Sequence, residues 1–422
     1  MNKRKKALVL GGTVPHCELI RQLKERGYYT VLVDYLDNPP AKAVADEHVQ
    51  ESTMDKEKVL EIAREKTADL VICGCVDQAN ITACYVSEKL GLTRPYSYET
   101  ASQITNKGVM KRVMMEKGIP TSKYIFFDRA DQEVKATLRY PVMVKPADSN
   151  SSNGVKKALN ESEMKMYLRD AIQISRSGKA IVEEFVQGRE ISAYCFIKER
   201  KAKLLMTAER ISTTDGAAKA IKCYASIAPA RLSQSLTIKA EYIATQIAEA
   251  FNLNNTPLFF QAMVENDDIL VIEFAPRTGG GMCFYTIKFN TGFDIISATI
   301  DSWLGIDADL SSWHAPENLV LVNTVYGKDG IFDHIEGINE LLNGNVVEAA
   351  FPIKMGGDVL DISRAASSRV IFLIVKADDE KNLLSKVEKI YETIKVLDPC
   401  GENLLREDLN IKVKWNEIKK LE

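Results

Sequence analysis

The first hundred residues alternate between short apolar runs and segments with helical periodicity, and this alternation restricts the fold more than any other feature of the chain. The expected strands are residues 6–10, 30–34 and 70–73, and the expected helices are residues 17–26, 56–66 and 78–90. Gly91 follows the last helix, where glycine commonly ends one. Strands that alternate with helices are joined by right-handed crossovers, so the pattern predicts a parallel sheet covered by helices.

The pattern changes after about residue 103. Strands now follow one another at hairpin-like spacing, which predicts a mixed α+β middle domain. Its expected strands are 124–127, 142–145, 180–184, 190–197, 203–209, 257–264 and 269–274, and its expected helices are 107–117, 161–174 and 235–251. A turn-rich segment at 326–330 suggests a further boundary, and residues 370–375 and 380–394 then read as a strand and a helix. We therefore expect three domains, at 1–103, 104–308 and 309–422.

Composition excludes several classes of protein. The chain has 422 residues, 45% hydrophobic and 27% charged, with a net charge of -3, so no global charge favours nucleic acid or an anionic membrane. No apolar run approaches the roughly 20 residues of a membrane helix. The basic residues Lys3 to Lys6 precede an apolar run too short for a signal peptide. The eight scattered cysteines fit the reduced thiols of a cytoplasmic protein. Together with the charge and the lack of a long apolar run, this predicts no nucleic-acid or membrane partner.

Two local features of the first domain carry weak signals. Gly11-Gly12-Thr13 lies between a strand and a helix, where backbone N–H groups could bind a carboxylate or phosphate, but the third glycine of a dinucleotide fingerprint is missing. His16 follows this turn and could reach a substrate, although no histidine is assigned as catalytic. Cys73-Gly74-Cys75 lacks the spacing of zinc or redox pairs, which favours a structural role.

The middle domain contains a lysine at a strand end beside a small polar turn. Lys145 precedes Pro146, and residues 149–154 are rich in serine, asparagine and glycine. A lysine there can neutralise phosphates while the N–H and hydroxyl groups of the turn surround them. Taken alone, Lys145 reads better as an ordinary surface lysine at a strand end, because surface exposure is the default for lysine.

Three further blocks bring carboxylates and an arginine to strands. Residues 181–186 form an apolar strand that can pair with an adenine edge, and Glu190 can accept from ribose hydroxyls. Gln261 and Glu273 lie on two apolar strands, where their oxygens can meet at one Mg²⁺ ion. Arg277 follows, and it reads either as a phosphoryl ligand or as an ion-pair partner of Glu273. Arg210 reads as a carboxylate clamp or as a surface ion pair.

In this order, the blocks over residues 107–306 resemble the ATP-grasp fold. The preceding strand–helix segment looks like the domain that precedes ATP-grasp in carbamoyl-phosphate synthetase, biotin carboxylase and the purine-pathway ligases. The resemblance implies a Rossmann-like N-terminal domain, an ATP-grasp domain and a small α+β C-terminal domain that closes the substrate site. Gly279-Gly280-Gly281 adds a likeness to the amino-acid ligase and carbamoyl-phosphate synthetase branches.

The resemblance also implies roles for individual residues. It implies that Lys107 and Lys145 bind the nucleotide phosphates, that Glu190 binds the ribose, that Gln261 and Glu273 bind Mg²⁺, with Mn²⁺ as an alternative, and that Arg277 and Lys145 are catalytic. The remaining implied residues are Ser151, Ser152, Gly154, Glu183, Glu184, Phe185 and Val186 for ATP, and Gly12, Arg210, Gly280 and Gly281 for the substrate. One departure is Ala275, where many relatives have the asparagine that serves a second metal ion.

The resemblance implies an ADP-forming carboxylate–amine ligase that works through an acyl phosphate. Small-molecule carboxylates and amines, amino acids among them, are the implied substrates, and relatives are often homodimers. A bicarbonate-activating carboxylase or a carbamoyl-phosphate-forming enzyme is the alternative within the family. Ala275 and Gln261 also leave open a protein that binds ATP without turnover.

Overall fold

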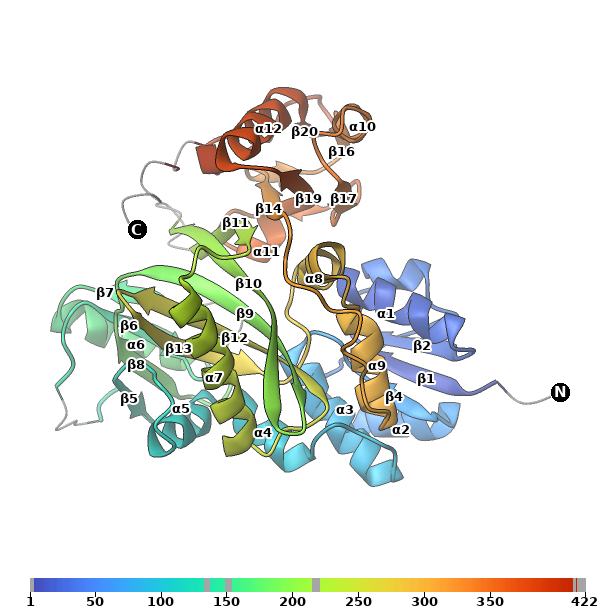
Figure 1. Ribbon diagram of the computed structural model, residues 1–422, viewed down its shortest axis with the longest axis vertical. Helices are drawn as coiled ribbons and strands as arrows, with labels where there is room; N and C mark the ends of the chain where they lie inside the picture. The colour runs from blue at the N-terminus through green and yellow to red at the C-terminus, as the bar shows by residue number, and fades with distance from the viewer. Residues whose placement is uncertain (1–3, 133–136, 149–153, 215–220, 413–414, 416–422) are drawn as a thin grey trace.

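The N-terminal part is built on a parallel four-stranded sheet with the order β3-β2-β1-β4 (Figure 1). The computed structural model describes residues 4–132, 137–148, 154–214, 221–412 and 415. The elements of this part are β1 (Lys6–Leu10), α1 (Val14–Glu25), β2 (Tyr29–Asp34), η1 (Pro40–Ala43), β3 (Glu47–Gln50), α2 (Lys56–Lys66), β4 (Leu70–Ile72) and α3 (Asp77–Leu90). The parallel sheet predicted from the alternating pattern is therefore confirmed.

Helix α1 begins earlier than the expected start at residue 17. It starts at Val14, with Pro15 in its first turn and Thr13 in extended conformation before it. Proline is compatible with the first turn because its missing N–H would have no partner there. The glycine turn thus leads directly into the helix.

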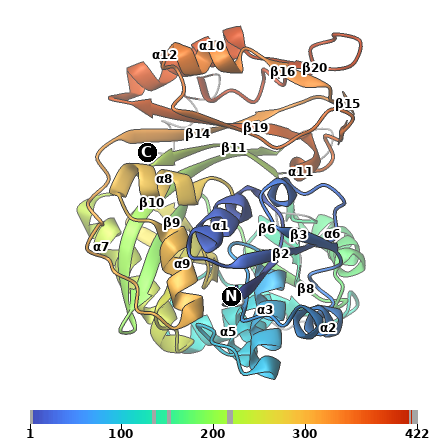
Figure 2. The same cartoon turned by 90° about the vertical axis from the view of Figure 1, so that its right-hand side faces the viewer.

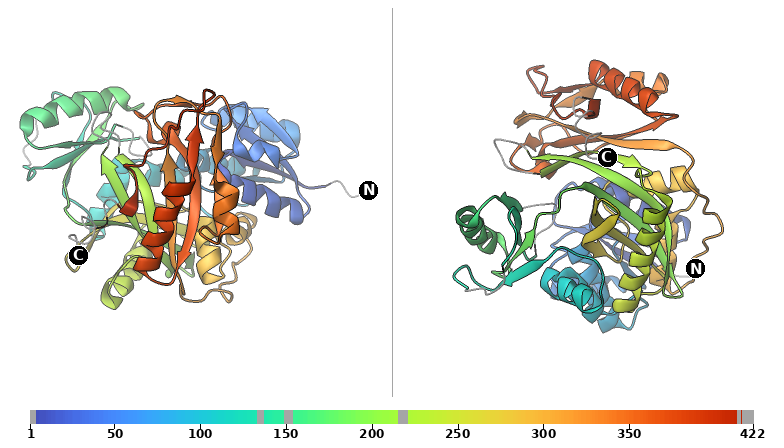
Figure 3. Two further views of the ribbon diagram at one scale, coloured as in Figure 1. Left: turned by 90° about the horizontal axis from the view of Figure 1, so that it is seen from above. Right: turned by 60° about the vertical axis from the view of Figure 1, so that its left-hand side comes forward.

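A small antiparallel sheet with the order β5-β8-β6-β7 lies on one side of the molecule. It comprises β5 (Tyr124–Phe127), β6 (Val142–Pro146), β7 (Lys156–Ala158) and β8 (Ala180–Glu184), and α6 (Glu161–Ile174) covers one face. Helices α4 (Tyr98–Thr105) and α5 (Lys107–Glu116) connect it to the N-terminal sheet. Seen from above, the small sheet and the N-terminal sheet lie on opposite sides of the large central sheet (Figure 3).

The central sheet has eight strands in the order β13-β12-β9-β10-β11-β14-β19-β17, and every neighbouring pair is antiparallel. Its strands and the helices packed near them are β9 (Arg189–Lys198), β10 (Lys201–Thr214), β11 (Ile221–Ala228), α7 (Gln234–Ala250), β12 (Thr256–Glu265), β13 (Asp268–Ala275), α8 (Cys283–Thr291), α9 (Ile295–Leu304), β14 (Leu319–Tyr326), β17 (Ala349–Pro352) and β19 (Arg369–Ala377).

The C-terminal part continues this sheet rather than starting a separate one. Strand β11 pairs with β14, and one apolar core contains Tyr224 and Ile227 together with Leu373 and Ile390. The other elements of this part are β15 (Gly330–Ile331), β16 (His334–Glu336), α10 (Ile338–Asn343), β18 (Val359–Leu360), α11 (Ala365–Ser368), α12 (Glu380–Thr393) and β20 (Lys395–Leu397). The division at residues 308 and 309 stays a prediction, and the sheet crosses it.

Helix α1 docks the N-terminal part onto α9 (Figure 2). The Arg26 guanidinium donates to Asp301 at 2.5 Å and to the Ser297 hydroxyl at 2.8 Å, and the Gln22 amide donates to Asp294 at 3.0 Å. These contacts fix the parallel sheet beside the central sheet. None of the helices in the described ranges is long and apolar enough to cross a bilayer.

Gly188 allows the chain to pass from β8 into β9 against the backbone of β12. A Cβ atom there would lie 2.2 Å from the Val264 carbonyl oxygen, which cannot move without disturbing the sheet. We expect Gly188→Ala to lower the free energy of unfolding by roughly 1–3 kcal/mol. Gly280→Ala is the matched control, because its Cβ would meet nothing within 4 Å, and it should change stability by no more than about 0.5 kcal/mol. Thermal unfolding of both variants checks this, and equal losses would contradict it.

Candidate active site

Two cavities meet at three shared side chains. The inter-sheet cavity, of about 250 Å³, lies between the small sheet and strands β12 and β13. The central cavity, of about 390 Å³, is bounded by all three parts of the chain. Glu190, Gln261 and Glu273 line both cavities. A molecule in one cavity can therefore react with a molecule in the other next to these oxygens.

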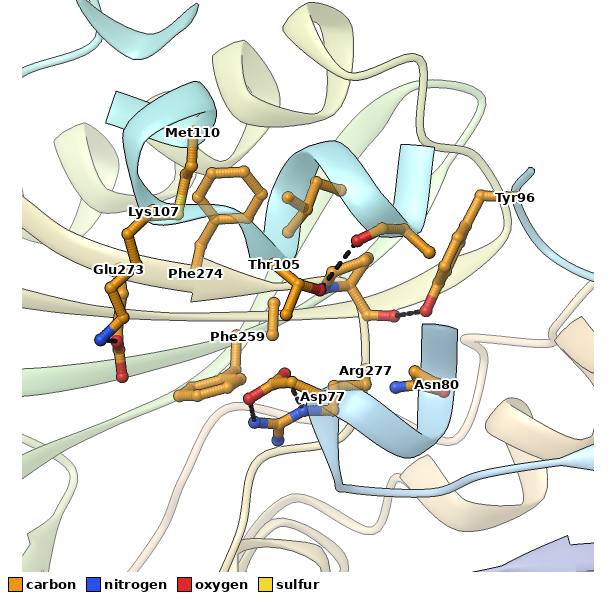
Figure 4. A pocket seen from close by; sticks show the side chains of 14 residues that line it. Asp77, Asn80, Tyr96, Thr105, Lys107, Met110, Phe259, Glu273, Phe274 and Arg277 are labelled. Carbon is orange, nitrogen blue, oxygen red and sulfur yellow. Dashed lines mark hydrogen bonds and ion pairs between the residues drawn. The ribbon is translucent and has the colours of Figure 1, made fainter. Parts of the chain in front are cut away.

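Gln261 and Glu273 are direct cross-strand partners. Strand β12 pairs with β13 in a register that sets Gln261 opposite Glu273, so both side chains lie on the same face of the sheet. The Lys107 ammonium lies 3.2 Å from the Glu273 carboxylate (Figure 4). Lys107 lowers the pKa of Glu273 to about 2 against the opposing effect of burial. Glu273 is thus an anion at neutral pH, beside an amide oxygen.

Two lysines pair with a buried glutamate at the polar end of the inter-sheet cavity, the end that contains Glu273. Glu183 forms ion pairs with Lys111, at 2.7 Å, and with Lys145, and Ser122 donates a hydrogen bond to it at 2.6 Å. Burial, and then repulsion from the neighbouring lysines, lower the pKa of both Lys111 and Lys145 to about 7. An added anion such as a phosphate would relieve that repulsion.

The other end of the inter-sheet cavity is apolar. Met143 comes from the small sheet, and Met263, Leu270 and Ile272 come from the central sheet, together with the segment after β8. Phe185 belongs to that segment, and the ammonium group of Lys157 lies 3.5 Å from the centre of its ring. The Glu184 carboxylate accepts from the Arg139 backbone N–H at 3.0 Å and from its guanidinium at 3.1 Å. A flat apolar ring fits between these walls.

Arg277 is joined to the N-terminal part rather than to Glu273. Its guanidinium makes two hydrogen bonds to the Asp77 carboxylate, at 2.5 and 2.7 Å, and stacks over Phe259 (Figure 4). The ion pair with Glu273 considered from the sequence is therefore wrong. The physical reason is that the chain leaves β13 after Ala275 and turns towards α3, where Asp77 begins the helix.

Arg210 and the glycine-rich turn line the central cavity. Arg210 lies opposite Glu190 in the pairing of β10 with β9 and donates to its carboxylate at 2.7 Å. Gly280 and Gly281 line the same cavity. Gly12 is not among the residues that line it. Its N–H donates to Asp34 and its carbonyl accepts from Ala41, so neither backbone group is free for a substrate.

The small polar turn is described only at its end. Ser151 and Ser152 lie outside the described residues. Gly154 has a φ of +73°, and a Cβ atom there would lie 2.8 Å from Pro146. Both observations explain why the turn ends in glycine.

Lys111, Asp77 and Arg369 belong to the site but were not predicted from the sequence. Lys111 follows Lys107 by one helical turn, so its position on the same face of α5 was a usable signal. Asp77 stands just beyond the carboxyl end of β4, where parallel sheets commonly bind ligands. Arg369 reaches the central cavity from the C-terminal part, and no local pattern indicates this.

Comparison with known proteins agrees with this architecture. A family model described as D-ala D-ala ligase C-terminus matches residues 113–275. The formate-dependent phosphoribosylglycinamide formyltransferase of Ignicoccus hospitalis is 30% identical over 197 residues, which is 45% of this chain and about half, 49%, of that relative. The enzyme of the same name from Prochlorococcus marinus is 23% identical over 382 residues, covering 89% of this chain and 96% of the relative.

Solved structures extend the likeness to nearly the whole chain. The L-amino acid ligase of Bacillus licheniformis superimposes with a TM-score of 0.79 at 18% identity, covering 94% of this chain and 100% of that one. At this identity the match shows the fold. The predicted order of a parallel sheet covered by helices, followed by a mixed α+β part, is confirmed.

The buried cluster around Glu183 generates a stability prediction. We expect Glu183→Gln to destabilise the protein by roughly 3–5 kcal/mol, because it leaves Lys111 and Lys145 buried without their carboxylate. Glu184→Gln is the matched control, since the Arg139 side chain that pairs with Glu184 is 87% exposed, and it should cost about 1 kcal/mol or less. Denaturant unfolding of both variants measures the difference. If both variants lost a similar free energy of unfolding, the buried ion pairs of Glu183 would not stabilise the protein more than the exposed pair of Glu184 does.

Proposed function

Because the chain belongs to the ATP-grasp superfamily of ADP-forming ligases, we propose that it joins a small carboxylate, such as an amino acid, to an amine through an acyl phosphate. The γ-phosphate of ATP is transferred to the carboxylate, and the amine then displaces phosphate from the activated carbonyl carbon. Both substrates are small molecules in this proposal.

The observation that carries the proposal is the junction of the two cavities at Glu190, Gln261 and Glu273. ATP occupies the inter-sheet cavity, with adenine between the methionine and leucine side chains and the phosphates towards the lysines. The carboxylate and the amine occupy the central cavity. The terminal phosphate then reaches Gln261 and Glu273, so phosphoryl transfer is confined to this place.

Lys107 and Lys145 bind the phosphates in this arrangement. Both lie at the junction end of the inter-sheet cavity, and their positive charges balance the charge that develops during phosphoryl transfer. Lys111 holds Glu183 in place from behind. In this proposal the Glu190 carboxylate, at the wall of the same cavity, accepts from the ribose hydroxyls.

The residues present fit a Mg²⁺ ion. ATP-grasp ligases use ATP with Mg²⁺. A carboxylate and an amide oxygen on directly paired strands are the hard ligands that Mg²⁺ takes alongside phosphate oxygens, and Mn²⁺ accepts the same set. When bound, the ion neutralises charge on the phosphates. Ala275 supplies no third ligand, so Gln261 and Glu273 are the protein's contribution.

Arg277 and Arg210 serve the central cavity. Arg277 is held by Asp77 at the wall of this cavity, and in this proposal its positive charge attracts the acyl phosphate. Arg210 and the turn at Gly280 and Gly281 border the acceptor in the same cavity.

A second candidate within the same reaction class is activation of formate or bicarbonate. The curated relatives are named as formate-dependent enzymes, and a structurally similar biotin carboxylase domain was solved with bicarbonate. A one-carbon acid would need less of the central cavity than an amino acid does. The substrate test below therefore includes formate and bicarbonate.

Phosphate release from ATP, measured with Mg²⁺ against single and paired amino acids, amines, formate and bicarbonate, tests the proposal. We expect release only when a carboxylate and an amine are both present. Mass spectrometry should find a product lighter by one water than the sum of the two. Release with formate or bicarbonate would favour the second candidate, and ATP binding without turnover on any substrate would contradict both.

Glu273 should matter for turnover far more than another acid on the same strand. We expect Glu273→Gln to lower kcat for phosphate release roughly 100-fold or more, because losing about 3 kcal/mol of charge stabilisation corresponds to two decades in rate. Asp268→Asn is the control, since that carboxylate is exposed and paired with Lys239 at the far end of β13, and it should leave kcat within about twofold. If Glu273→Gln turned over ATP normally, the metal assignment would be wrong.

A further inference from the structure

The fold brings one histidine and two cysteines together at the carboxyl end of the N-terminal sheet. His16 on α1 is fully buried, and its ring lies 3.9 Å from the sulfurs of Cys73 and Cys75. The Thr13 hydroxyl completes the group, 2.9 Å from His16 Nδ1 and 3.5 Å from the Cys75 sulfur. The sequence indicated only a structural role for the two cysteines, because their partner is far away along the chain.

Cys75 differs from the other cysteines near the central cavity in what it contacts. The thiols of Cys73, Cys223 and Cys283 donate to backbone carbonyl oxygens, at 3.4, 3.4 and 2.9 Å. The hydrogen-bond partners of Cys75 within the described part of the chain are the His16 ring and the Thr13 hydroxyl. A sulfur next to an imidazole and a hydroxyl, rather than a carbonyl, can release its proton to the ring.

The surrounding charges favour the thiolate. Although burial opposes ionisation, His16, then Thr13 and Arg277, lower the pKa of Cys75. Burial also opposes protonation of the His16 ring, but the sulfurs of Cys75 and Cys73 raise its pKa to about 10. Asp77 is the nearby acid, and its charge is balanced by two hydrogen bonds from Arg277.

Cys75 is also open to the central cavity. It is 8% exposed and lines that cavity with Asp77 and Arg277, whereas it does not line the inter-sheet cavity. A group attached to its sulfur would occupy space that the proposed function gives to the carboxylate and the amine. The nucleotide space would stay open.

We propose that Cys75 and His16 form a nucleophilic modification site for soft carbon electrophiles, and that modification of Cys75 closes the substrate cavity without closing the nucleotide cavity. The Cys75 sulfur supplies the electron pair for the new S–C bond, the leaving group departs with the electrons of its own bond, and His16 keeps the proton. The reactivity of the thiol does not depend on the proposed function, but the expected loss of turnover rests on it.

The experiment is site-resolved alkylation of the full-length protein with iodoacetamide, followed by peptide mass spectrometry, at pH 6 and pH 8. Cys400 is an internal reference because it is exposed. An ordinary thiol, with a pKa of about 8.5, should react roughly 50- to 100-fold more slowly at pH 6 than at pH 8. We expect the rate at Cys75 to fall no more than about threefold. No alkylation of Cys75, or a rate that falls in step with Cys400, would overturn the proposal.

Two variants separate the dyad from simple access to the cavity. His16→Gln should slow alkylation of Cys75 at pH 6 by at least about tenfold and restore an ordinary pH dependence. Cys73→Ala is the matched control, since Cys73 contacts the same ring but donates to the Val76 carbonyl, and the rate at Cys75 should stay within about threefold. If His16→Gln does not fold, the pH profile of the natural chain still decides.

The effect of alkylation on nucleotide binding and on turnover is measured in separate assays. After alkylation, MgATP should still raise the melting temperature, while phosphate release in the presence of substrates should fall by at least tenfold. Full turnover by protein alkylated at Cys75 would overturn the claim that the cavity is closed. If the unmodified protein released no phosphate on any substrate, the proposed function would fail, and the pH profile of Cys75 would stand or fall independently.

Discussion

The pairing of β12 with β13 places Gln261 directly opposite Glu273, and the rest of the candidate site is arranged around this register. A shift by one residue would turn one of the two side chains to the opposite face of the sheet. Both side chains instead lie at the boundary of the two cavities, where Lys107 keeps Glu273 ionised. The small sheet then closes over this face, and its Lys145 and Glu183 complete the polar end of the inter-sheet cavity.

Burial of opposite charges joins parts of the chain that are distant in sequence. Glu183 links the small sheet to α5 through Lys111, and Arg277 links the end of β13 to α3 through Asp77. Each of these groups is costly to bury alone, so each pair forms only when both elements are in place. The positions of the lysines and of Arg277 are therefore tied to the docking of whole elements rather than to flexible side chains.

The same geometry explains why the central cavity contains groups of different chemistry. The N-terminal part contributes Cys75 and Asp77, the central sheet contributes Arg210 and Glu190, and the C-terminal part contributes Arg369. The continuous eight-stranded sheet fixes the positions of Arg210 and Glu190 relative to Arg369. The docking of α1 on α9 fixes the contribution of the N-terminal part, so the central cavity is shaped by contacts far from the inter-sheet cavity.

The sequence by itself determined many of the elements and the residue types that line the inter-sheet cavity. Periodicity predicted β5, β8 and α6 with the bounds that the structure has, because strands and helices that bury one face leave a local apolar pattern. It did not predict β11, where the buried Lys222 interrupts that pattern, nor α8 and α9, which have little polar surface to contrast with. Only the tertiary structure decided that Arg277 pairs with Asp77, that Glu183 pairs with Lys111, and that His16 meets Cys75. Such pairs depend on distances between residues far apart in the chain, and these distances are set by how the sheets and helices pack.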